Sequence, residues 1–549
     1  KGWSTCRSRQ YCSTGPHGPT PRPDYDSDVS VQKTNDELGV QTYYTSTEQG
    51  LVLTVTRDYA GANAIRFEYA YDPNFPQNVT SITPVDPATG LRNIDWQMSK
   101  YDYYQTGSTS PGSLFHVYRV HNDVPMTTDT LGTYVYNSKG QVTQYTDGAG
   151  HTTDYTYDAS FNLWKVQGPA NNDAGTRPPT TYGYDSLGRV ASVTAPLNHV
   201  TTYLYDNLNR VTSVTLPKPS VSSTLNFVTT YSYDNDDGVA GLRFTHVTDP
   251  NGNVTKQGYD EFGRLIQAIA AQTHVTSYAY TNGLLTSLTD ANANVRTYEY
   301  DLLGRWLTFT YLNGTNMDNY AYNTDGTLEI FYSRDGWRRN YYDHLKRVTR
   351  RDSGAPFFDF TYVGQKLTQV GEGDGYGWTQ TNTMSYDPSY RLQSATAGTR
   401  GTITYGYNTD DTVASYAVAG GPTSTYAYYP DRSLNTINWT PVAGQFKYRY
   451  TLPGQYQSLT YPNGGTRNYT YDDQTRLTQL TNLDPIAGNL ATYAYSYDFN
   501  HTTGLSTMLG QRSSMFATVP SQSLTNKEFK YEYDSLYQLK KVTYPNVAP

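Results

Sequence analysis

The sequence predicts an all-β protein that is one long array of stacked β-hairpins, and three observations predict it. A tyrosine-rich unit recurs about every 21 residues along the 549-residue chain, and a period of this length is typical of repeat architectures. The chain holds 56 Tyr against 16 Phe and 7 Trp, and tyrosine, with threonine and valine, favours half-buried strands. The apolar residues show no helical periodicity along the chain.

The repeating unit reads Tyr-x-Tyr-Asp-x-x-Gly-Arg-Val and contains the signals of one hairpin. Its two tyrosines lie two residues apart, hence on the same face of a strand. The aspartate favours the first position of a type I turn, and the glycine accepts the positive φ angle that closes the hairpin. We therefore expect successive hairpins to stack their tyrosines into ladders. The clearest copies contain Tyr182, Tyr184, Asp185, Gly188 and Arg189; Tyr203, Tyr205, Asp206 and Arg210; Tyr298, Tyr300, Asp301, Gly304 and Arg305; and Tyr469, Tyr471, Asp472 and Arg476.

Along the chain, the units divide the sequence into three predicted parts. Residues 1–40 are rich in Pro, Gly, Ser and Asp, which indicates an extended leader without a core. Residues 41–130 show strand patterns and indicate a divergent β region at the start of the array. Residues 131–549 carry the regular repeat. Extra residues at 168–180 and 217–223 fall at the same point of the unit, so we expect both insertions to project from one edge of the sheet.

Composition excludes two classes of partner. Charged residues make up 16% of the chain and the net charge is −8, without the basic stripe that binding to nucleic acid requires. No apolar run reaches the 18 residues of a membrane-spanning helix. Cys6 and Cys12 have two interpretations: a disulfide that closes a small loop in an oxidising compartment, or two unrelated thiols in a flexible tail.

The chain shows no catalytic or cofactor motif, so we predict a protein that is not an enzyme and needs no cofactor or metal. The nine histidines are scattered, and neither a metal-site His pair, a Gly-x-Ser-x-Gly elbow nor a P-loop occurs. The aspartates recur at the first position of each turn, and turn formation explains that spacing. The repeated arginines have two interpretations. They pack on neighbouring tyrosine rings and bind turn oxygens, which we favour, or they form an array that recognises glycans or unfolded polypeptide.

These units resemble those of the YD-repeat, or Rhs, family, whose members include bacterial Rhs proteins, the Tc toxin BC component, wall-associated proteins and teneurins. The resemblance covers residues 131–549, and more loosely the chain from about residue 41. It implies a β-ribbon that spirals into a hollow shell, which in bacterial members commonly encloses a toxic C-terminal domain. Nothing after Tyr533 matches the segment that caps the family's toxin-bearing shells, so we expect the cargo to lie outside this chain.

The repeat count also predicts the size of the ribbon. About 36 strands at about 4.8 Å spacing make a ribbon about 170 Å long, which is nearly used up by one turn round a cavity about 50 Å across. Its open edges need capping by more chain or by another subunit.

Our hypothesis is a non-enzymatic shell segment of a secreted or surface-displayed bacterial protein, which encloses a toxin-like C-terminal cargo. The alternative is an extracellular structural or adhesive repeat protein: a filament, a rod or a glycan-binding surface. A homo-oligomer is compatible with this alternative.

Overall fold

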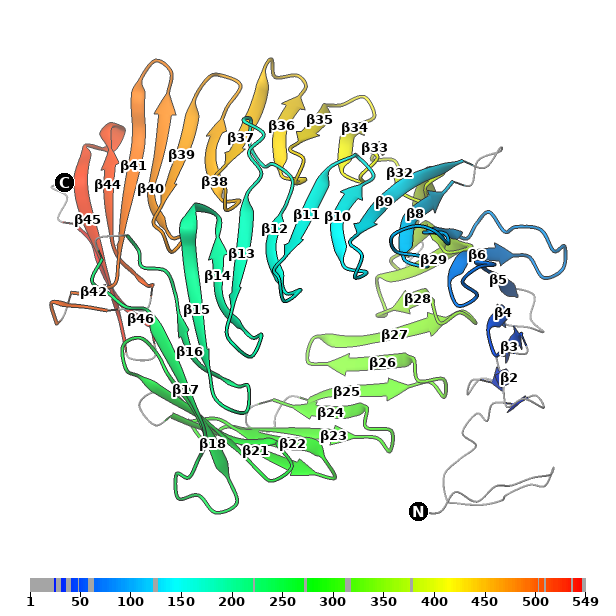
Figure 1. Cartoon of the computed structure of the whole chain (residues 1–549), viewed down its shortest axis with the longest axis horizontal. Coiled ribbons are helices and arrows are strands. Elements are labelled where there is room, and N and C mark those ends of the chain that lie inside the picture. Colours follow the sequence, from blue (N-terminus) through cyan, green and yellow to red (C-terminus); the bar gives the residue numbers. More distant parts are fainter. Residues whose placement is uncertain are drawn as a thin grey trace.

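The computed structural model is a single antiparallel sheet of 44 strands that winds round a central axis as a spiral ribbon (Figure 1). The structure describes residues 24–25, 31–35, 41–47, 49–57, 64–121, 127–220, 223–270, 274–311, 317–375, 379–501, 503–507, 510–534 and 537–545. Among these residues helix is limited to two 3-10 turns, η1 (Pro196–Asn198) and η3 (Pro520–Gln522). Within them, no helix has the length and apolar character needed to cross a membrane. The all-β fold class is therefore confirmed.

The strands of the first half of the chain follow one another along the ribbon. They are β1 (Asp24–Tyr25), β2 (Val31–Asn35), β3 (Gln41–Ser46), β4 (Val52–Arg57), β5 (Ile65–Tyr71), β6 (Val79–Val85), β7 (Ser99–Tyr103), β8 (Leu114–Val120), β9 (Thr128–Tyr136), β10 (Val142–Asp147), β11 (Thr152–Tyr157), β12 (Leu163–Gln167), β13 (Pro179–Tyr184), β14 (Val190–Ala195), β15 (His199–Tyr205), β16 (Val211–Thr215), β17 (Val228–Asn235), β18 (Arg243–Thr248), β19 (Val254–Tyr259), β20 (Leu265–Ala270), β21 (His274–Thr281), β22 (Leu284–Thr289) and β23 (Val295–Tyr300).

The second half continues the same meander. Its strands are β24 (Trp306–Thr310), β25 (Met317–Tyr322), β26 (Leu328–Ser333), β27 (Gly336–Tyr342), β28 (Val348–Asp352), β29 (Phe357–Val363), β30 (Lys366–Gly373), β31 (Thr379–Tyr386), β32 (Leu392–Ala397), β33 (Thr402–Tyr407), β34 (Val413–Val418), β35 (Thr423–Tyr428), β36 (Leu434–Trp439), β37 (Gln445–Tyr450), β38 (Tyr456–Thr460), β39 (Thr466–Tyr471), β40 (Leu477–Asp484), β41 (Gly488–Tyr497), β42 (Phe499–Asn500), β43 (Leu505–Ser506), β44 (Arg512–Val519), β45 (Leu524–Tyr533) and β46 (Leu539–Thr543). β41 pairs directly with β44, while β42 and β43 pair only with each other.

The sheet has more strands than the repeat count predicts, 44 instead of about 36. The hairpins β7–β8 and β29–β30 keep the tyrosine, at Tyr103 and Tyr362, but have lost the Asp-x-x-Gly turn, so the motif alone does not reveal them. β1 and β2 also lie inside residues 1–40, and β2 pairs with β3, so the paired sheet extends into the segment expected to be a leader. Cys6 and Cys12 lie outside the described residues.

Where a unit keeps its aspartate, the hairpin closes through a turn that begins at that residue. The Gly188 N–H donates to the Asp185 carbonyl at 3.0 Å, and Gly188 has a φ of 77°. The Asp185 carboxylate accepts bonds from the Leu187 N–H at 2.9 Å and the Arg189 N–H at 3.0 Å. Its second oxygen accepts from Arg189 Nε at 2.8 Å. The aspartate therefore satisfies the turn and orients the arginine. The same carboxylate contacts recur at Asp206, Asp301 and Asp472.

These turns predict a loss of stability in acid. Hydrogen bonds from the Arg189 N–H and, in the next unit, from the Arg210 N–H hold the pKa of Asp185 and of Asp206 below the ordinary value of 3.8. A depressed pKa contributes stability that is present above the unfolded value and is lost as pH falls through the folded value. We expect the thermal midpoint to be flat from pH 7 to about pH 4 and to fall below that. Thermal unfolding at pH 2 to 7 checks it. A loss that begins near pH 6 would assign the dependence to histidines instead.

In many units the last tyrosine joins one hairpin to the hairpin before it. Tyr205 Oη donates to the Val190 carbonyl at 2.8 Å, and the Arg189 guanidinium lies over the Tyr205 ring, 4.6 Å from its centroid. The hydroxyl contact recurs at Tyr71, Tyr103, Tyr157, Tyr184, Tyr233, Tyr342, Tyr362, Tyr386, Tyr407, Tyr428 and Tyr497. The arginine contact recurs at Arg210, Arg305, Arg391 and Arg476. In these units, then, the motif residues hold the sheet together.

Loss of one such hydroxyl has a predicted local effect. Tyr205→Phe is expected to lower the free energy of unfolding by about 1 kcal/mol, because the bond to the Val190 carbonyl is lost while the ring contact with Arg189 stays. Chemical denaturation measures the change. Tyr203→Phe is the control, because Tyr203 lies on the same strand and face and is likewise half-buried. An equal loss of unfolding free energy in both variants would show that the bond from Tyr205 to the Val190 carbonyl is not the source of the effect.

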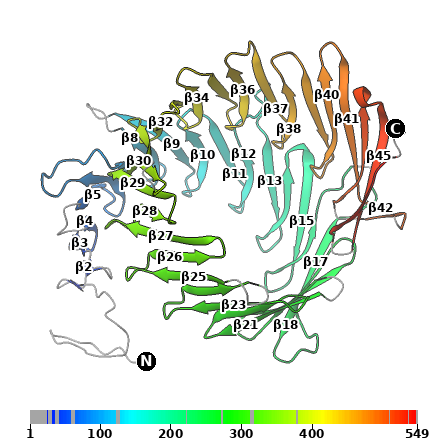
Figure 2. The same cartoon turned by 180° about the vertical axis from the view of Figure 1, so that it is seen from behind.

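The ribbon winds through almost two rounds, and β9 to β13 run beside β33 to β38 in both views (Figures 1 and 2). The link between β12 and β13 contacts the turn between β35 and β36, where the Asp431 N–H donates to the Ala170 carbonyl at 3.2 Å. It also contacts the turn between β37 and β38, where Asn171 Nδ2 donates to the Thr451 carbonyl at 2.8 Å. One round therefore takes 23 to 25 strands.

This count changes the predicted dimensions. About 24 strands at about 4.8 Å spacing give a circumference of about 115 Å and a width of about 37 Å between backbones. The expected single turn about 50 Å across is wrong. Strand number and spacing give the length of the ribbon but not its curvature, and the sheet curves more tightly than we expected. Most strand residues are half-buried in this single-layer sheet, and fully buried apolar side chains such as Ile65, Val120 and Phe227 lie where the two rounds meet.

Candidate functional site

The two rounds of the spiral meet along one continuous contact, which we call the seam. The ribbon has two edges: the turn edge, where the Asp-x-x-Gly turns lie, and the link edge, where one unit connects to the next. In the seam, the link edge of the first round contacts the turn edge of the second. The link edge contributes residues 86–98, 119–121, 147–151, 168–178, 195–199, 216–220 and 248–253, and the turn edge contributes residues 343–347, 363–366, 387–391, 408–412, 429–433, 451–455, 472–476 and 537–538.

Tyrosine hydroxyls cross the seam and donate to the first round. Tyr390 Oη lies 2.7 Å from the carbonyl oxygens of both Ile94 and Trp96, which share its single proton. Tyr429 Oη donates to Asp173 Oδ1 at 2.8 Å. Burial, followed by this bond to a carboxylate, raises the pKa of Tyr429 to about 12. The hydroxyl therefore keeps its proton and remains a donor throughout the physiological range.

A buried ion pair lies at the same contact. Arg119 is 5% exposed and donates to Asp411 of the second round. Asp411 Oδ1 also accepts from Arg391 Nη1 at 3.0 Å. Because a charge as buried as Arg119 needs an opposite charge, Asp411 fixes where the second round sits.

The residue at the fourth position of the turn differs between the turns that lie in the seam and those on the free turn edge. On the free turn edge of the first round this position is mostly glycine, with φ between 76° and 77° at Gly140, Gly188, Gly263 and Gly304, although Phe161 and Asn209 are exceptions. In the seam it is mostly a residue with a side chain, with φ between 62° and 69° at Lys346, Tyr390, Asp411, Arg432, Thr475 and Tyr537.

A positive φ strains most residues other than glycine, so these seam side chains persist only if other contacts compensate. Tyr390, Asp411 and Tyr537 each contact the first round through that side chain. These residues were not predicted from the sequence, because the prediction rested on the positions of the repeat that stay constant. The available signal was the loss of glycine at one position of the later units.

The predicted motif residues divide between these two environments. Those of the units at 182–189, 203–210 and 298–305 lie on strands and turns of the free turn edge, whereas Asp472 and Arg476 lie in the seam. Next to them, the Asp473 N–H donates to the Pro219 carbonyl at 3.0 Å and Gln474 Nε2 donates to the Pro217 carbonyl at 2.7 Å.

The two insertions lie on one edge as expected, but they do not project from it. The described part of 217–223 packs on Asp473 and Gln474, and Asn171, within 168–180, is only 2% exposed. The expectation failed because the sequence gives no indication that a second round covers this edge.

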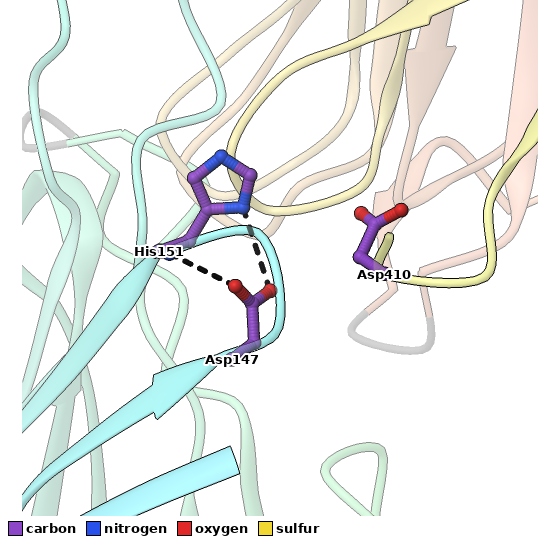
Figure 3. Close-up of side chains that lie close together, drawn as sticks. All are labelled: Asp147, His151 and Asp410. Atoms are coloured by element: carbon purple, nitrogen blue, oxygen red, sulfur yellow. Dashed lines mark hydrogen bonds and ion pairs between the residues drawn. The ribbon is translucent and has the colours of Figure 1, made fainter. Parts of the chain in front are cut away.

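The seam also brings together a cluster of potential metal ligands (Figure 3). Asp147 and His151 lie on the link between β10 and β11, and Asp410 lies on the turn between β33 and β34. One ligand atom from each of the three residues lies within 4.8 Å of the other two. His151 was one of the scattered histidines of the sequence, and only the contact between rounds places it beside two carboxylates.

Comparison with known proteins supports the repeat and the fold. The profile of the family described as RHS Repeat matches residues 136–172, 184–221, 240–275 and 280–315. No curated protein matches the sequence. The crystal structure of TcdB2-TccC3 is 13% identical with a TM-score of 0.52, over 96% of this chain and 36% of that chain. This chain thus spans about a third of that protein's length, and the likeness shows the fold.

Two further solved structures score lower and carry no further argument. The crystal structure of TcdB2-TccC3-Cdc42 is 12% identical with a TM-score of 0.48, over 96% of this chain and 38% of that chain. The Tc holotoxin pore of Photorhabdus luminescens, with the TccC3 mutation D651A, is 11% identical with a TM-score of 0.45, over 96% of this chain and 37% of that chain.

Proposed function

Because the chain is an Rhs (YD-repeat) family protein with the β-shell fold, we propose that it forms the wall of a container for a toxin-like cargo. The cargo is a C-terminal domain encoded outside these 549 residues, and the parent protein is secreted from or displayed on a bacterial cell. The wall itself is not an enzyme; its aspartates recur with the turns, which is the spacing of structural residues.

The seam is the observation that carries this proposal. A ribbon whose rounds touch edge to edge makes a continuous wall, and the contacts between rounds recur from Ile94 with Tyr390 to Asp249 with Tyr537. The ring is about 37 Å wide between backbones. A folded domain of about 100 residues has a radius of gyration of about 13 Å, so the cargo is either a small domain or a chain held unfolded.

A container also needs closed ends, and the free turn edge is chemically suited to a partner. In several of its turns the third position is apolar and exposed, at 70% for Leu187, 69% for Leu208 and 73% for Phe262. In two turns of the seam the same position is buried, at 6% for Ser389 and 8% for Asp410. A row of exposed apolar tips indicates a surface that another subunit or more chain covers.

Electron cryo-microscopy of the native protein with its downstream sequence tests the container. We expect a closed ring with internal density and a cargo that resists protease. A variant that opens the seam should expose the cargo to protease, while a matched substitution on the free turn edge should not. An empty ring, or a cargo cleaved equally fast in all variants, would overturn the proposal.

The same edges favour a second candidate, an extracellular structural or adhesive polymer. The free turn edge of one molecule has the backbone geometry of the edge that binds the link edge in the seam, so copies can stack end to end. Concentration-dependent filaments with an empty interior would favour this candidate. Retention on a polysaccharide column would favour a glycan-binding surface, for which the tyrosine and arginine ladders are the candidate residues.

A further inference from the structure

We propose that Asp147, His151 and Asp410 bind one first-row divalent cation, with Zn²⁺ as the best fit, and that this ion clamps the two rounds of the spiral together. Asp147 and His151 belong to the first round and Asp410 to the second (Figure 3). An ion held by all three therefore joins segments that are distant in sequence. This inference does not depend on whether the shell encloses a cargo.

The geometry is close to that of a metal site. His151 Nδ1 lies 3.4 Å from Asp147 Oδ2, and all three ligand atoms lie within 4.8 Å of one another. Zinc bonds of about 2.0–2.2 Å in a tetrahedral site place neighbouring ligand atoms about 3.4 Å apart. Asp410 therefore needs to approach by about 1.4 Å at most, which rotation of its carboxylate supplies.

The burial and bonding of the ligand atoms favour a cation at this place. His151 Nδ1 is buried and, within the described part of the chain, has no hydrogen-bond partner, while Asp147 Oδ2 lies 3.4 Å away. The Asp147 and Asp410 side chains are only 8% and 6% exposed. Asp410 Oδ1 accepts two bonds from Thr412, at 3.1 Å from the N–H and 2.7 Å from Oγ1. Its Oδ2 lies 3.8 Å from Arg432 Nε. Two carboxylates buried this closely require positive charge between them.

Arg432 does not supply that charge well. Its side chain is 49% exposed, its Nη2 lies 3.5 Å from Asp147 Oδ2, and its Nε lies 3.8 Å from Asp410 Oδ2. Both distances exceed those of a good charge-assisted hydrogen bond. Because the guanidinium is half-exposed, it can turn to solvent when an ion enters.

Beside the cluster, the backbone of the first round at Gly148 lies in close contact with the backbone of the second round at Thr409. A Cβ at Gly148 would lie 3.2 Å from the Thr409 carbonyl oxygen and 2.8 Å from the Thr130 carbonyl oxygen. A cavity of about 440 Å³ lined by Ala149, His151 and Asp410 opens next to the cluster, which gives an entry path and room for a water as fourth ligand.

The donor set selects the class of ion. One imidazole nitrogen and two carboxylate oxygens suit Zn²⁺ and its first-row neighbours, whereas Ca²⁺ and Mg²⁺ prefer oxygen ligands alone and higher coordination. The experiment therefore uses ZnCl2 on metal-stripped protein in a Cys6→Ser/Cys12→Ser background, because two thiolates elsewhere in the chain also bind zinc.

We expect calorimetry and metal analysis to find about one equivalent of Zn²⁺ per chain. Thermal unfolding should occur at a higher temperature with ZnCl2 than with EDTA. Asp410→Asn and His151→Gln should each weaken binding by more than about 100-fold, beyond the range for residues that only orient a ligand. His199→Gln is the control, because His199 is also a seam histidine, with Nε2 3.8 Å from Asp473 Oδ1, but among the described residues it belongs to no cluster of three potential ligands.

A spectroscopic measurement on the unsubstituted cluster covers the case in which a variant fails to fold. Co²⁺ should give a tetrahedral visible spectrum without a sulfur charge-transfer band. The proposal is overturned if zinc does not bind stoichiometrically, if His199→Gln weakens binding as much as His151→Gln, or if Ca²⁺ and Mg²⁺ bind and Zn²⁺ does not.

Discussion

Gly364→Ala is expected to lower the free energy of unfolding by about 3 kcal/mol, mostly by forcing the seam apart. Gly364 has a φ of 55°, which alanine adopts only under strain. A Cβ at this position would also fall on the backbone of Asp95 in the first round. Backbone cannot move aside as a flexible side chain does, so the two rounds must separate locally.

Gly188→Ala is the matched control for this prediction. Gly188 has a φ of 77°, but a Cβ there meets nothing within 4 Å, so it measures the backbone strain alone, about 1 kcal/mol. Chemical denaturation gives the two free energies, and hydrogen exchange of residues 86–98 and 357–366 should accelerate only in Gly364→Ala. Equal losses, or no acceleration of exchange, would contradict the close contact at this point of the seam.

Asp411→Asn is the second large effect that we expect, a loss of about 2 kcal/mol. Asparagine keeps the shape and tolerates the φ of 69° at this position, so the substitution removes only the charge. Arg119, 5% exposed, then keeps a buried positive charge without its carboxylate. The loss stays below the range for fully buried pairs because the Asp411 side chain is 48% exposed.

Asp234→Asn is the matched control on the free turn edge. Asp234 also has a positive φ, 58°, and pairs with Arg210 Nη1 at 2.6 Å, but its side chain is 65% exposed. Exposed ion pairs contribute about 0–1 kcal/mol, so we expect almost no change in denaturant unfolding. Arg119→Met added to Asp411→Asn should recover part of the loss, because it removes the unpaired charge. A failure to recover any stability would contradict the buried pair as the cause.

The local structure of this protein is predictable because the chemistry that fixes it lies within a few residues. Asp185 and Gly188 identify a turn, and Tyr182 and Tyr184 identify a strand face, so the motif predicts the hairpin that the structure contains. Where the motif has decayed, as after Tyr103 and Tyr362, the same argument misses hairpins that the structure contains. Those missed hairpins account for much of the error in strand number.

The seam could not be predicted in the same way, although one of its signals was present. Tyr390 and Asp411 occupy a position that is mostly glycine on the free turn edge. The loss of glycine at this position indicates a turn whose side chain makes a contact outside its own hairpin. What each side chain contacts depends on which link lies opposite it. A shift of one unit would place Asp411 beside a different link and leave Arg119 unpaired.

The sequence by itself determined the all-β class, the hairpin repeat and the tyrosine and arginine ladders, because strand alternation and turn geometry are local properties. Only the tertiary structure decided that 23 to 25 strands complete one round, that link edge meets turn edge, and that His151 lies beside Asp410. The physical reason is that small rotations between neighbouring strands accumulate along the sheet. Their sum over about 24 strands sets which residues of the first round contact which residues of the second.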